Sequence, residues 1–449
     1  MNLSRMLAQR EAAGDPVKVG IIGCGKFGAM YLSQARLTKG VHVVGIADLN
    51  VARAGETLTH IGWEAERFAA RSFDDAEKHR STFITDDSAS LIRDGGLDVL
   101  IEATGDPAAG IRHCLMAISH GLHVVMVNVE ADVVAGPLLA RKAELAGTVY
   151  SLAWGDQPAL IAEHVDWARA CGFKVVSAGK GTRYLPSFHQ STPDTVWDHF
   201  GWDPEVVKRG RLNPKMFNSF IDGTKSGIEM SAVCNAAGLT PQPDGLAFPP
   251  CSRFDLAEVC KPVGNGGTLT HSGTTEVVSS LTRDGADVEG HLQYGTFVVI
   301  EGETDYARYC FEEYHMLPDS SFRFASLYRP THMIGLELGI SVASAALRGE
   351  PTGSPIAFNS DVVATAKRDL AKGEMLDGEG GFSVWGKQTP ARTSLDEGYL
   401  PLGLAQNVKM KRSVATGERL KWTDVEIDNS DDAVKVRREM EAMFAGPNS

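Results

Sequence analysis

A short glycine-rich segment near the start of the chain constrains the fold more than any other feature. The apolar, β-branched run Val17–Ile22 is typical of a buried parallel strand, and a Gly-x-Gly-x-x-Gly turn follows directly at 23–28. In such a turn the first glycine permits a tight bend, the second lets a pyrophosphate approach the backbone, and the third lets helix pack on strand. A second strand at Val41–Ala47 ends at Asp48. This order predicts a dinucleotide-binding fold, with an anion site at the start of the helix.

The first 152 residues alternate between strand and helix patterns. The predicted strands are Val17–Ile22, Val41–Ala47, Asp98–Ala103, His123–Val127 and Thr148–Leu152, and the predicted helices are Ala29–Thr38, Asn50–His60, Pro107–His120 and Asp132–Ala146. Such alternation predicts an α/β Rossmann domain with a doubly wound parallel sheet, whose ligand lies at the carboxyl ends of the strands. Residues 62–87 are polar and mixed, and we interpret them as an insertion.

The rest of the chain has a different pattern of predicted helices and strands. Residues 153–354 mix helix and strand without strict alternation, which predicts an α+β substrate domain. Beyond residue 355, the segment Asp361–Leu376 is similar to Ala405–Leu420, each reading as a short strand, a basic pair and a Gly-Glu turn. These two segments predict a small β module of two related hairpins. The predicted domains are therefore 1–152, with 1–16 as an N-terminal extension, 153–354 and 355–449.

Composition narrows the possible partners and the cellular compartment. The formal net charge of −13 argues against nucleic acid or an anionic membrane as a partner. The seven cysteines are scattered with no Cys-x-x-Cys, and no uncharged apolar run is long enough to cross a bilayer. The histidines show no metal-binding spacing. We expect a cytoplasmic protein, with its use of a metal left open.

Two residues after the second strand favour different cofactors. Asp48 is placed to accept hydrogen bonds from an adenosine ribose, which favours NAD, whereas Arg53 can pair with a 2′-phosphate, which favours NADP. The residues alone leave NAD and NADPH both possible. The predicted cofactor-binding residues are Gly23, Gly25, Lys26, Phe27, Gly28, Asp48, Arg53, Thr104, Gly105 and Asn128.

The main catalytic candidates lie far beyond the glycine turn. If the segment is helical, Asp222, Lys225 and Glu229 share one face with Ser226 adjacent, and the apolar residues that follow indicate burial. Buried ionisable groups are costly unless they pair or bind a ligand, so either an internal ion-pair network or a substrate and acid/base face is possible. Lys180, between two glycines after a strand, suits a phosphate or carboxylate ligand, or else marks a flexible turn.

With these residues in view, the chain resembles the homoserine-dehydrogenase-like oxidoreductases. The resemblance in the nucleotide half rests on residues 17–28, 98–105 and 123–130. More distinctive are Phe220–Met230 and the tail 357–428, which looks like an SAF module, a β-clip domain. The chain as a whole is similar to the deoxyxylulose-5-phosphate reductoisomerase-like enzymes of certain bacteria.

That resemblance implies conversion of 1-deoxy-D-xylulose 5-phosphate to 2-C-methyl-D-erythritol 4-phosphate with NADPH, in isoprenoid synthesis, by a homodimer. It also implies a dimerisation role for the middle domain, and a phosphate anchor at Lys180, or at Lys225 with Ser226. Asp222, Glu229 or Asp156 is the implied base or holds a divalent ion. The Asp-x-Glu metal motif of ordinary reductoisomerases is absent near the expected strand end.

Two alternatives stay open. One is an NAD(P)-dependent dehydrogenase of a small hydroxy acid, amino acid or sugar acid on the same fold. A homoserine dehydrogenase itself is less favoured, because Val129 follows Asn128 where that family usually carries lysine. The other alternative is a sensor that holds NADP without turnover.

Overall fold

The computed structural model describes residues 2–209 and 212–446, and the chain divides into two compact units. The first unit comprises Met1–Leu160 and Met333–Pro355. The second comprises Ile161–His332 and Ile356–Ser449. Each unit is built from two separate stretches of chain.

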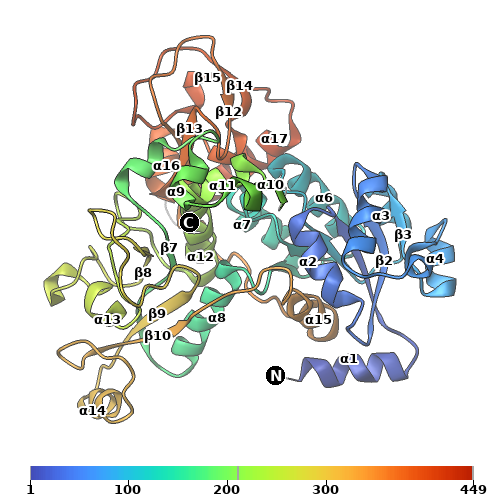
Figure 1. Cartoon of the computed structure of the whole chain (residues 1–449), viewed down its shortest axis with the longest axis horizontal. Helices are drawn as coiled ribbons and strands as arrows, with labels where there is room; N and C mark the ends of the chain where they lie inside the picture. The colour runs from blue at the N-terminus through green and yellow to red at the C-terminus, as the bar shows by residue number, and fades with distance from the viewer. Residues whose placement is uncertain (1, 210–211, 447–449) are drawn as a thin grey trace. The chain divides into compact units, whose positions relative to one another are not determined.

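The first unit contains a six-stranded, wholly parallel sheet in the order β3-β2-β1-β4-β5-β6. Figure 1 labels two of its strands, β2 and β3. Its strands are β1 Val17–Ile22, β2 Val41–Ala47, β3 Phe83–Thr85, β4 Val99–Glu102, β5 His123–Met126 and β6 Tyr150–Leu152. Strand order reverses between β1 and β4, which is the switch point where doubly wound sheets bind ligands. The predicted α/β Rossmann class is confirmed.

Helices cover both faces of this sheet. They are α1 Leu3–Ala12, α2 Lys26–Ala35, α3 Val51–His60, α4 Phe73–His79, α5 Ser88–Asp94, α6 Pro107–Ser119, α7 Val129–Leu145 and α15 Gly339–Arg348, with the 3-10 turn η1 Ala65–Phe68. Apolar residues of α1, α2, α3 and α15 share one buried cluster with β1 and β2. Helix α15 therefore belongs to the nucleotide half although it lies late in the sequence.

The interpretation of residues 62–87 as an insertion is wrong. The stretch supplies η1, α4 and the edge strand β3, which pairs with β2 through Gly45–Ala47. Its apolar residues are few because β3 has only three residues and lies at the edge of the sheet. Short edge strands carry a weak hydrophobic pattern.

The second unit contains a mixed four-stranded sheet in the order β10-β9-β7-β8. Its strands are β7 Lys174–Thr182, β8 Thr274–Ser279, β9 Thr296–Glu301 and β10 Phe324–Arg329. Strands β7 and β8 are parallel, whereas β9 is antiparallel to both β7 and β10. The helices of this unit are α8 Gln157–Ala170 (which begins in the first unit), α9 Val196–Phe200, α10 Pro204–Arg209, α11 Pro214–Ile221, α12 Thr224–Ala237, α13 Leu256–Val259, α14 Asp305–Glu313, α16 Ala391–Glu397 and α17 Asp432–Phe444, with 3-10 turns η2 Pro186–Gln190, η3 Val263–Asn265, η4 Leu402–Leu404 and η5 Trp422–Asp424.

The tail of the second unit is a β structure with internal symmetry. Its strands are β11 Ser360–Ala366, β12 Met375–Asp377, β13 Val384–Pro390, β14 Gln406–Met410 and β15 Val425–Glu426. The two similar segments found in the sequence bond to each other in matching ways: Gly373 N–H donates to Met410 O, and Gly417 N–H donates to Ala366 O. Both glycines have positive φ, so each Gly-Glu turn needs glycine.

Candidate functional site

The glycine turn of the first unit has the geometry expected of a pyrophosphate site. Gly23 has φ +101, and a Cβ there would lie 2.5 Å from Ala103 O. A Cβ at Gly28 would lie 2.2 Å from Gly23 O, because α2 packs closely on the turn. A Cβ at Gly25 would meet no protein atom within 4 Å. Open space at the second glycine, at the start of α2, is what a pyrophosphate needs.

Asp48 and Arg53, which favour different cofactors, form an ion pair. Arg53 Nη2 lies 3.1 Å from Asp48 Oδ1. The Asp48 carboxylate also accepts hydrogen bonds from the backbone N–H groups of Cys24 (2.9 Å) and Asn50 (2.9 Å). Its side chain is 6% exposed, whereas that of Arg53 is 58% exposed. Asp48 is therefore fixed against the glycine turn, and Arg53 is the exposed member of the pair.

The carboxyl ends of β4 and β5 carry a polar network. Thr104 Oγ1 donates to the fully buried Glu102 carboxylate (2.8 Å), which His113 Nδ1 also contacts at 3.1 Å. Asn128 caps α7 by accepting from Ala131 N–H, and its amide donates to Asp106 O (2.8 Å). Gly105 has φ +72, and both Thr104 and Gly105 are exposed. Lys26, at the start of α2, is also exposed. Phe27 is half-buried against the core of the unit.

In the second unit, a polar row crosses one face of the sheet. Lys180 on β7 is paired in register with Thr296 on β9, which is paired with Arg329 on β10. Residues directly opposite each other point to the same face of a sheet, so these three side chains share a face. Lys180 and Thr296 are buried, and Arg329, on the sheet's edge strand, is half-buried.

The glycines beside Lys180 do not form the ligand-binding turn that the sequence suggested. Lys180 lies inside β7, which extends to Thr182. A Cβ at Gly179 would lie 1.7 Å from Glu276 O, and one at Gly181 would lie 1.9 Å from Leu292 O. The two glycines therefore allow neighbouring backbone to approach β7.

Helix α12 places a carboxylate against this row. Lys180 Nζ and Glu229 form a buried ion pair, with side chains 5% and 2% exposed. Met230 and Val233 of the same helix pack in the apolar cluster on this face of the sheet. The prediction that the helix is buried is confirmed, since twelve of its fourteen residues are buried.

Three buried polar atoms of this unit have no hydrogen-bond partner within the described part of the chain: Ser226 Oγ, Thr296 Oγ1 and His164 Nδ1. Ser226 precedes Glu229 by one helical turn and is 1% exposed. Burial and the charge of Arg329 lower the pKa of His164 to about 4, so its ring is neutral at pH 7. Burial also raises the pKa of Glu163, against the effect of Arg329. Buried groups without partners are costly, which marks them as candidates for ligand contacts.

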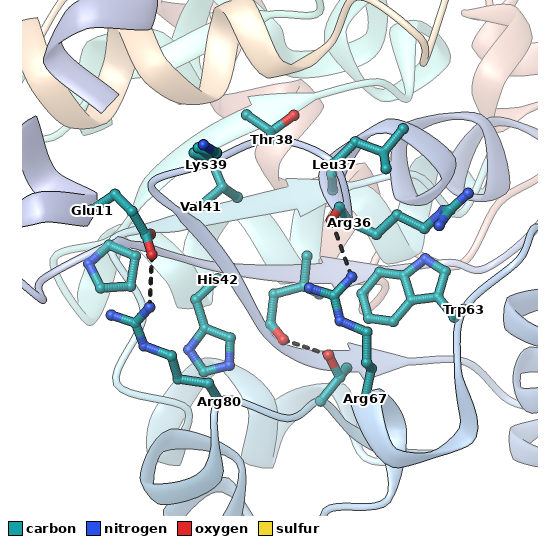
Figure 2. A pocket seen from close by; sticks show the side chains of 14 residues that line it. Glu11, Arg36, Leu37, Thr38, Lys39, Val41, His42, Trp63, Arg67 and Arg80 are labelled. Carbon is teal, nitrogen blue, oxygen red and sulfur yellow. Dashed lines mark hydrogen bonds and ion pairs between the residues drawn. The ribbon is translucent and has the colours of Figure 1, made fainter. Parts of the chain in front are cut away.

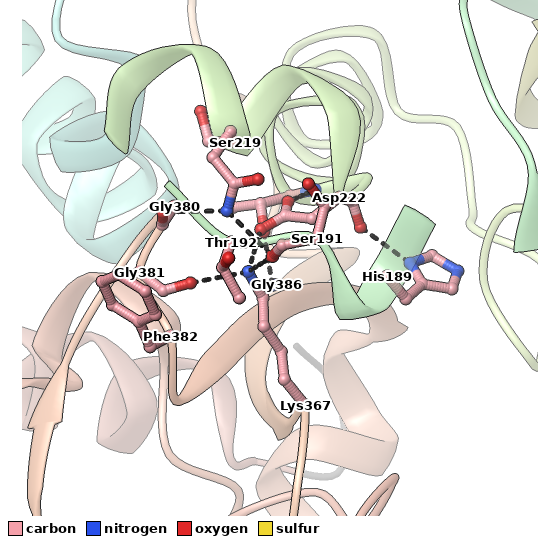
Figure 3. A network of polar contacts seen from close by, with 12 residues as sticks. His189, Ser191, Thr192, Ser219, Asp222, Lys367, Gly380, Gly381, Phe382 and Gly386 are labelled. Carbon is pink, nitrogen blue, oxygen red and sulfur yellow. Dashed lines mark hydrogen bonds and ion pairs between the residues drawn. The ribbon is translucent and has the colours of Figure 1, made fainter. Parts of the chain in front are cut away.

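Asp222 does not share a helix with Glu229, as the sequence reading supposed. Gly223, with φ +89, separates α11 from α12, and Asp222 Oδ1 accepts a hydrogen bond from Thr224 N–H (2.9 Å). The Asp222 carboxylate pairs with Lys367 Nζ at 2.7 Å, and Lys367 also donates to the carbonyls of Ser191 (2.7 Å) and Gly381 (2.8 Å) (Figure 3).

His189 connects this network to two aromatic side chains. His189 Nδ1 lies 2.7 Å from Asp222 O, and its Nε2 lies 2.9 Å from Tyr184 Oη. The imidazole stacks on Trp385 with ring centroids 3.8 Å apart. The Asp222–Lys367 pair therefore joins the tail to the rest of this unit. Lys225, at the start of α12, is half-buried.

Within residues 2–209 and 212–446, no group of three or more His, Cys, Asp or Glu side chains is arranged to hold a metal ion. Asp156, which the family resemblance implies as a base or metal ligand, is buried and accepts a hydrogen bond from Gln157 N–H (2.9 Å). Across the same described residues, no helix combines the length and apolarity that crossing a membrane requires.

Comparison with protein families agrees with this geometry. Residues 17–126 match the oxidoreductase family with an NAD-binding Rossmann fold, and residues 155–338 match the catalytic domain of oxidoreductase DRL. The second match contains Lys180, Glu229 and Arg329. The two matched regions indicate that the chain is an NAD(P)-dependent oxidoreductase with an NAD-binding Rossmann fold.

Solved structures resemble the chain at low identity. Dihydrodipicolinate reductase from Paenisporosarcina sp. TG-14 is 12% identical, with a TM-score of 0.34, covering 75% of this chain and 97% of that one. The putative oxidoreductase YvaA from Bacillus subtilis is 12% identical (TM-score 0.36; 75% and 90% covered). The 1-deoxy-D-xylulose 5-phosphate reductoisomerase of Zymomonas mobilis, in complex with NADPH, is 19% identical (TM-score 0.33; 49% and 58% covered). Such scores carry no argument about substrate. No curated protein matches the chain significantly.

Proposed function

We propose that this oxidoreductase is an NADPH-dependent reductoisomerase that converts 1-deoxy-D-xylulose 5-phosphate to 2-C-methyl-D-erythritol 4-phosphate. The observation that carries the proposal is the row of Lys180, Thr296 and Arg329 beside the ion-paired Glu229, inside the region that matches the DRL catalytic domain. The row offers cations and hydroxyls to a small phosphorylated sugar.

The phosphate is assigned to the Arg329 end of the row, where the row is more exposed. A guanidinium presents a planar fork of donors that matches two phosphate oxygens. Thr296 Oγ1 and Ser226 Oγ, buried and without partners among the described residues, supply neutral hydrogen bonds to the sugar. Together these groups would fix the orientation of the substrate.

Acid–base work is assigned to the Lys180–Glu229 pair. The rearrangement requires a base to take a hydroxyl proton while a carbon–carbon bond breaks and a new one forms, giving an aldehyde. Reduction then requires an acid to protonate the alkoxide. A buried ammonium next to a carboxylate can stabilise an oxyanion and exchange its proton with the partner. Bound NADPH would supply the hydride.

The preference for NADPH is assigned to Arg53. Its guanidinium is largely exposed beside the end of β2, and its partner Asp48 is already held by the two backbone N–H groups. Arg53 can therefore turn to a 2′-phosphate without leaving Asp48 unsatisfied.

Steady-state kinetics test the proposal. We expect purified protein to oxidise NADPH when 1-deoxy-D-xylulose 5-phosphate is added, forming one equivalent of 2-C-methyl-D-erythritol 4-phosphate by mass spectrometry. Turnover with a hydroxy acid, amino acid or sugar acid, and none with the sugar phosphate, would refute it.

That outcome would favour the second candidate, an NAD(P)-dependent dehydrogenase of such an acid. One observation supports this candidate: the Asp48 carboxylate is fixed against the glycine turn, where it suits the ribose of NAD. The same Arg329 fork would then hold a substrate carboxylate. A lower KM for NAD than for NADP would accompany it.

Other features of the working protein follow from the same proposal. We propose that it acts as a homodimer in the cytoplasm, in isoprenoid precursor synthesis, with no nucleic-acid or membrane partner. The tail is proposed to be an SAF-like β-clip, supported by the matching bonds between its two repeats. The net charge of −13 and the absence of disulfides among the seven cysteines support the cytoplasmic assignment.

A further inference from the structure

The first unit has a cavity at the amino-terminal end of β2, whereas the glycine turn lies at the carboxyl ends of the strands. The cavity has a volume of about 190 Å³ and is lined by the start of β2 (Val41–Val43), the end of α2 and the loop 36–39 that follows. Asp48 and the glycine turn, by contrast, lie at the carboxyl ends of β2 and β1. The cavity is therefore separate from the predicted cofactor site.

Basic side chains outnumber acidic ones in the lining. Arg36, Lys39, Arg67 and Arg80 line the cavity, and Glu11 is the only acidic residue among those lining it (Figure 2). Arg80 Nη1 pairs with Glu11 at 3.0 Å. Three cations are left without a carboxylate within hydrogen-bond or ion-pair distance in the described part of the chain. A concave surface with this excess of one charge concentrates ligands of the opposite sign.

One of these cations, Arg67, is held in place, and a second, Arg36, has a donor that is unpaired within the described residues. Arg67 Nη1 donates to Arg36 O (3.1 Å), and its guanidinium lies 5.8 Å from the centre of the Trp63 ring. Arg36 Nε is buried and has no acceptor among the described residues. A donor without an acceptor at an anchored site is what an anionic ligand would satisfy.

A neutral histidine completes the wall. His42 Nε2 lies 2.8 Å from Ser81 O. Burial is the main cause that lowers the pKa of His42, and the charges of Arg80 and Lys18 lower it further, against the hydrogen bond to Ser81 O and the charge of Glu77. A bound anion would oppose the effect of the two cations, so the pKa of His42 reports occupancy of the cavity.

The cavity has room for a small ligand. Its volume of about 190 Å³ accommodates one phosphate group on a short carbon chain. We propose that the cavity is a second anion site, which binds a compact phosphate monoester or inorganic phosphate independently of the cofactor.

Calorimetric titration tests this site directly. Inorganic phosphate and glycerol 3-phosphate are titrated at constant ionic strength into the full-length protein saturated with NADPH, so that the glycine turn is occupied. The variants are Arg36→Gln and Arg67→Gln, with Arg71→Gln as a matched control, because Arg71 is exposed and lies outside the lining. Thermal unfolding confirms that each variant is folded.

We expect saturable binding that weakens about tenfold in Arg36→Gln and in Arg67→Gln and is unchanged in Arg71→Gln. In the wild type, the NMR titration of His42 moves to higher pH when phosphate is bound. Equal affinity in all variants, or no saturable binding, overturns the proposal. Succinate binding as tightly as phosphate overturns the assignment to phosphate. If one variant fails to fold, the other variant and the His42 titration decide.

Discussion

The glycine turn of the first unit and the polar row of the second unit are built in opposite ways. The turn is one contiguous segment, Gly23–Gly28, in which Gly23 and Gly28 avoid backbone clashes and Gly25 leaves open space for a ligand. The row takes Lys180, Thr296 and Arg329 from three strands and Glu229 from a helix. A local motif can be recognised in the sequence, whereas a site assembled across a sheet cannot.

Because of this difference, the two sites should be sensitive to different kinds of substitution. The turn holds its ligand with backbone groups, so its sensitivity is to added atoms. The row holds buried charges that depend on each other, so its sensitivity is to lost partners.

The largest effect is expected from Lys180→Met. It leaves Glu229 buried without its ammonium, which should lower the free energy of unfolding by about 3–5 kcal/mol and kcat by about 10²–10⁴-fold. The double variant Lys180→Met/Glu229→Gln should regain much of the stability but none of the activity. Denaturant unfolding and NADPH oxidation measure the two. Recovery of activity in the double variant would make the pair structural.

A buried carboxyl in the first unit is expected to set part of the pH dependence of stability. Burial raises the pKa of Asp132 to about 7 from about 3.8, against a hydrogen bond from Tyr150 Oη (2.8 Å). A raised pKa favours the folded state below pH 4, and this contribution is lost as the pH rises through 7. The loss amounts to at most about 4 kcal/mol.

Asp132→Asn keeps an acceptor for Tyr150 and removes the titration. Relative to wild type, this variant should therefore gain stability between pH 4 and pH 8, as measured by urea unfolding. The exposed Asp86→Asn is the control. Parallel pH profiles for Asp132→Asn and wild type would show that Asp132 does not titrate in this range.

The two glycine positions at the start of α2 are expected to separate fold from cofactor binding. Gly28→Ala should destabilise the protein by about 1–3 kcal/mol, because its Cβ would lie 2.2 Å from Gly23 O. Gly25→Ala should leave the apparent melting temperature of the free protein unchanged and raise the KM for NADPH at least tenfold. An equal loss of stability in both variants would contradict the assigned role of Gly25.

Arg53→Ala is expected to act on one cofactor only. Loss of a charged hydrogen bond to the 2′-phosphate should raise the KM for NADPH about tenfold or more and leave the KM for NADH nearly unchanged. Parallel titrations with the two cofactors measure the ratio. If both KM values move together, Arg53 acts by orienting Asp48.

The smallest effect is expected from Thr296→Val. Valine removes a buried hydroxyl that has no partner among the described residues, so stability should stay equal or rise slightly, while the KM for substrate rises up to about tenfold. Thr274→Val is a matched control, since Thr274 Oγ1 is also buried without a partner but belongs to the opposite face of the sheet. Equal kinetics in the two variants would remove Thr296 from the site.

The contrast between the two units also explains what the sequence predicted. The Rossmann strands and the positions of Gly23, Gly28 and Asp48 followed from local patterns, because turn sterics and strand hydrophobicity depend on near neighbours. Strand β3 was not predicted, because a three-residue edge strand has almost no hydrophobic pattern of its own.

The second unit was predicted less completely for the same physical reason. The sequence indicates Asp222, Lys225 and Glu229 as charges beside an apolar run and Lys180 as a lysine between two glycines, but the partners of these residues depend on strand register and on contacts distant in the sequence. Nothing local joins Thr296 to Lys180, or Lys367 to Asp222. A threonine at the start of a strand followed by Phe297–Ile300 gave no signal beyond β propensity.

The most direct measurement follows one deuterium atom through the reaction. Protein is incubated with 1-deoxy-D-xylulose 5-phosphate and NADPH deuterated at the transferable C4 position, and the product is analysed by NMR and mass spectrometry. The account predicts 2-C-methyl-D-erythritol 4-phosphate with one deuterium on the hydroxymethyl carbon formed from the aldehyde. An unrearranged, deuterated alcohol or no oxidation of the cofactor would contradict it.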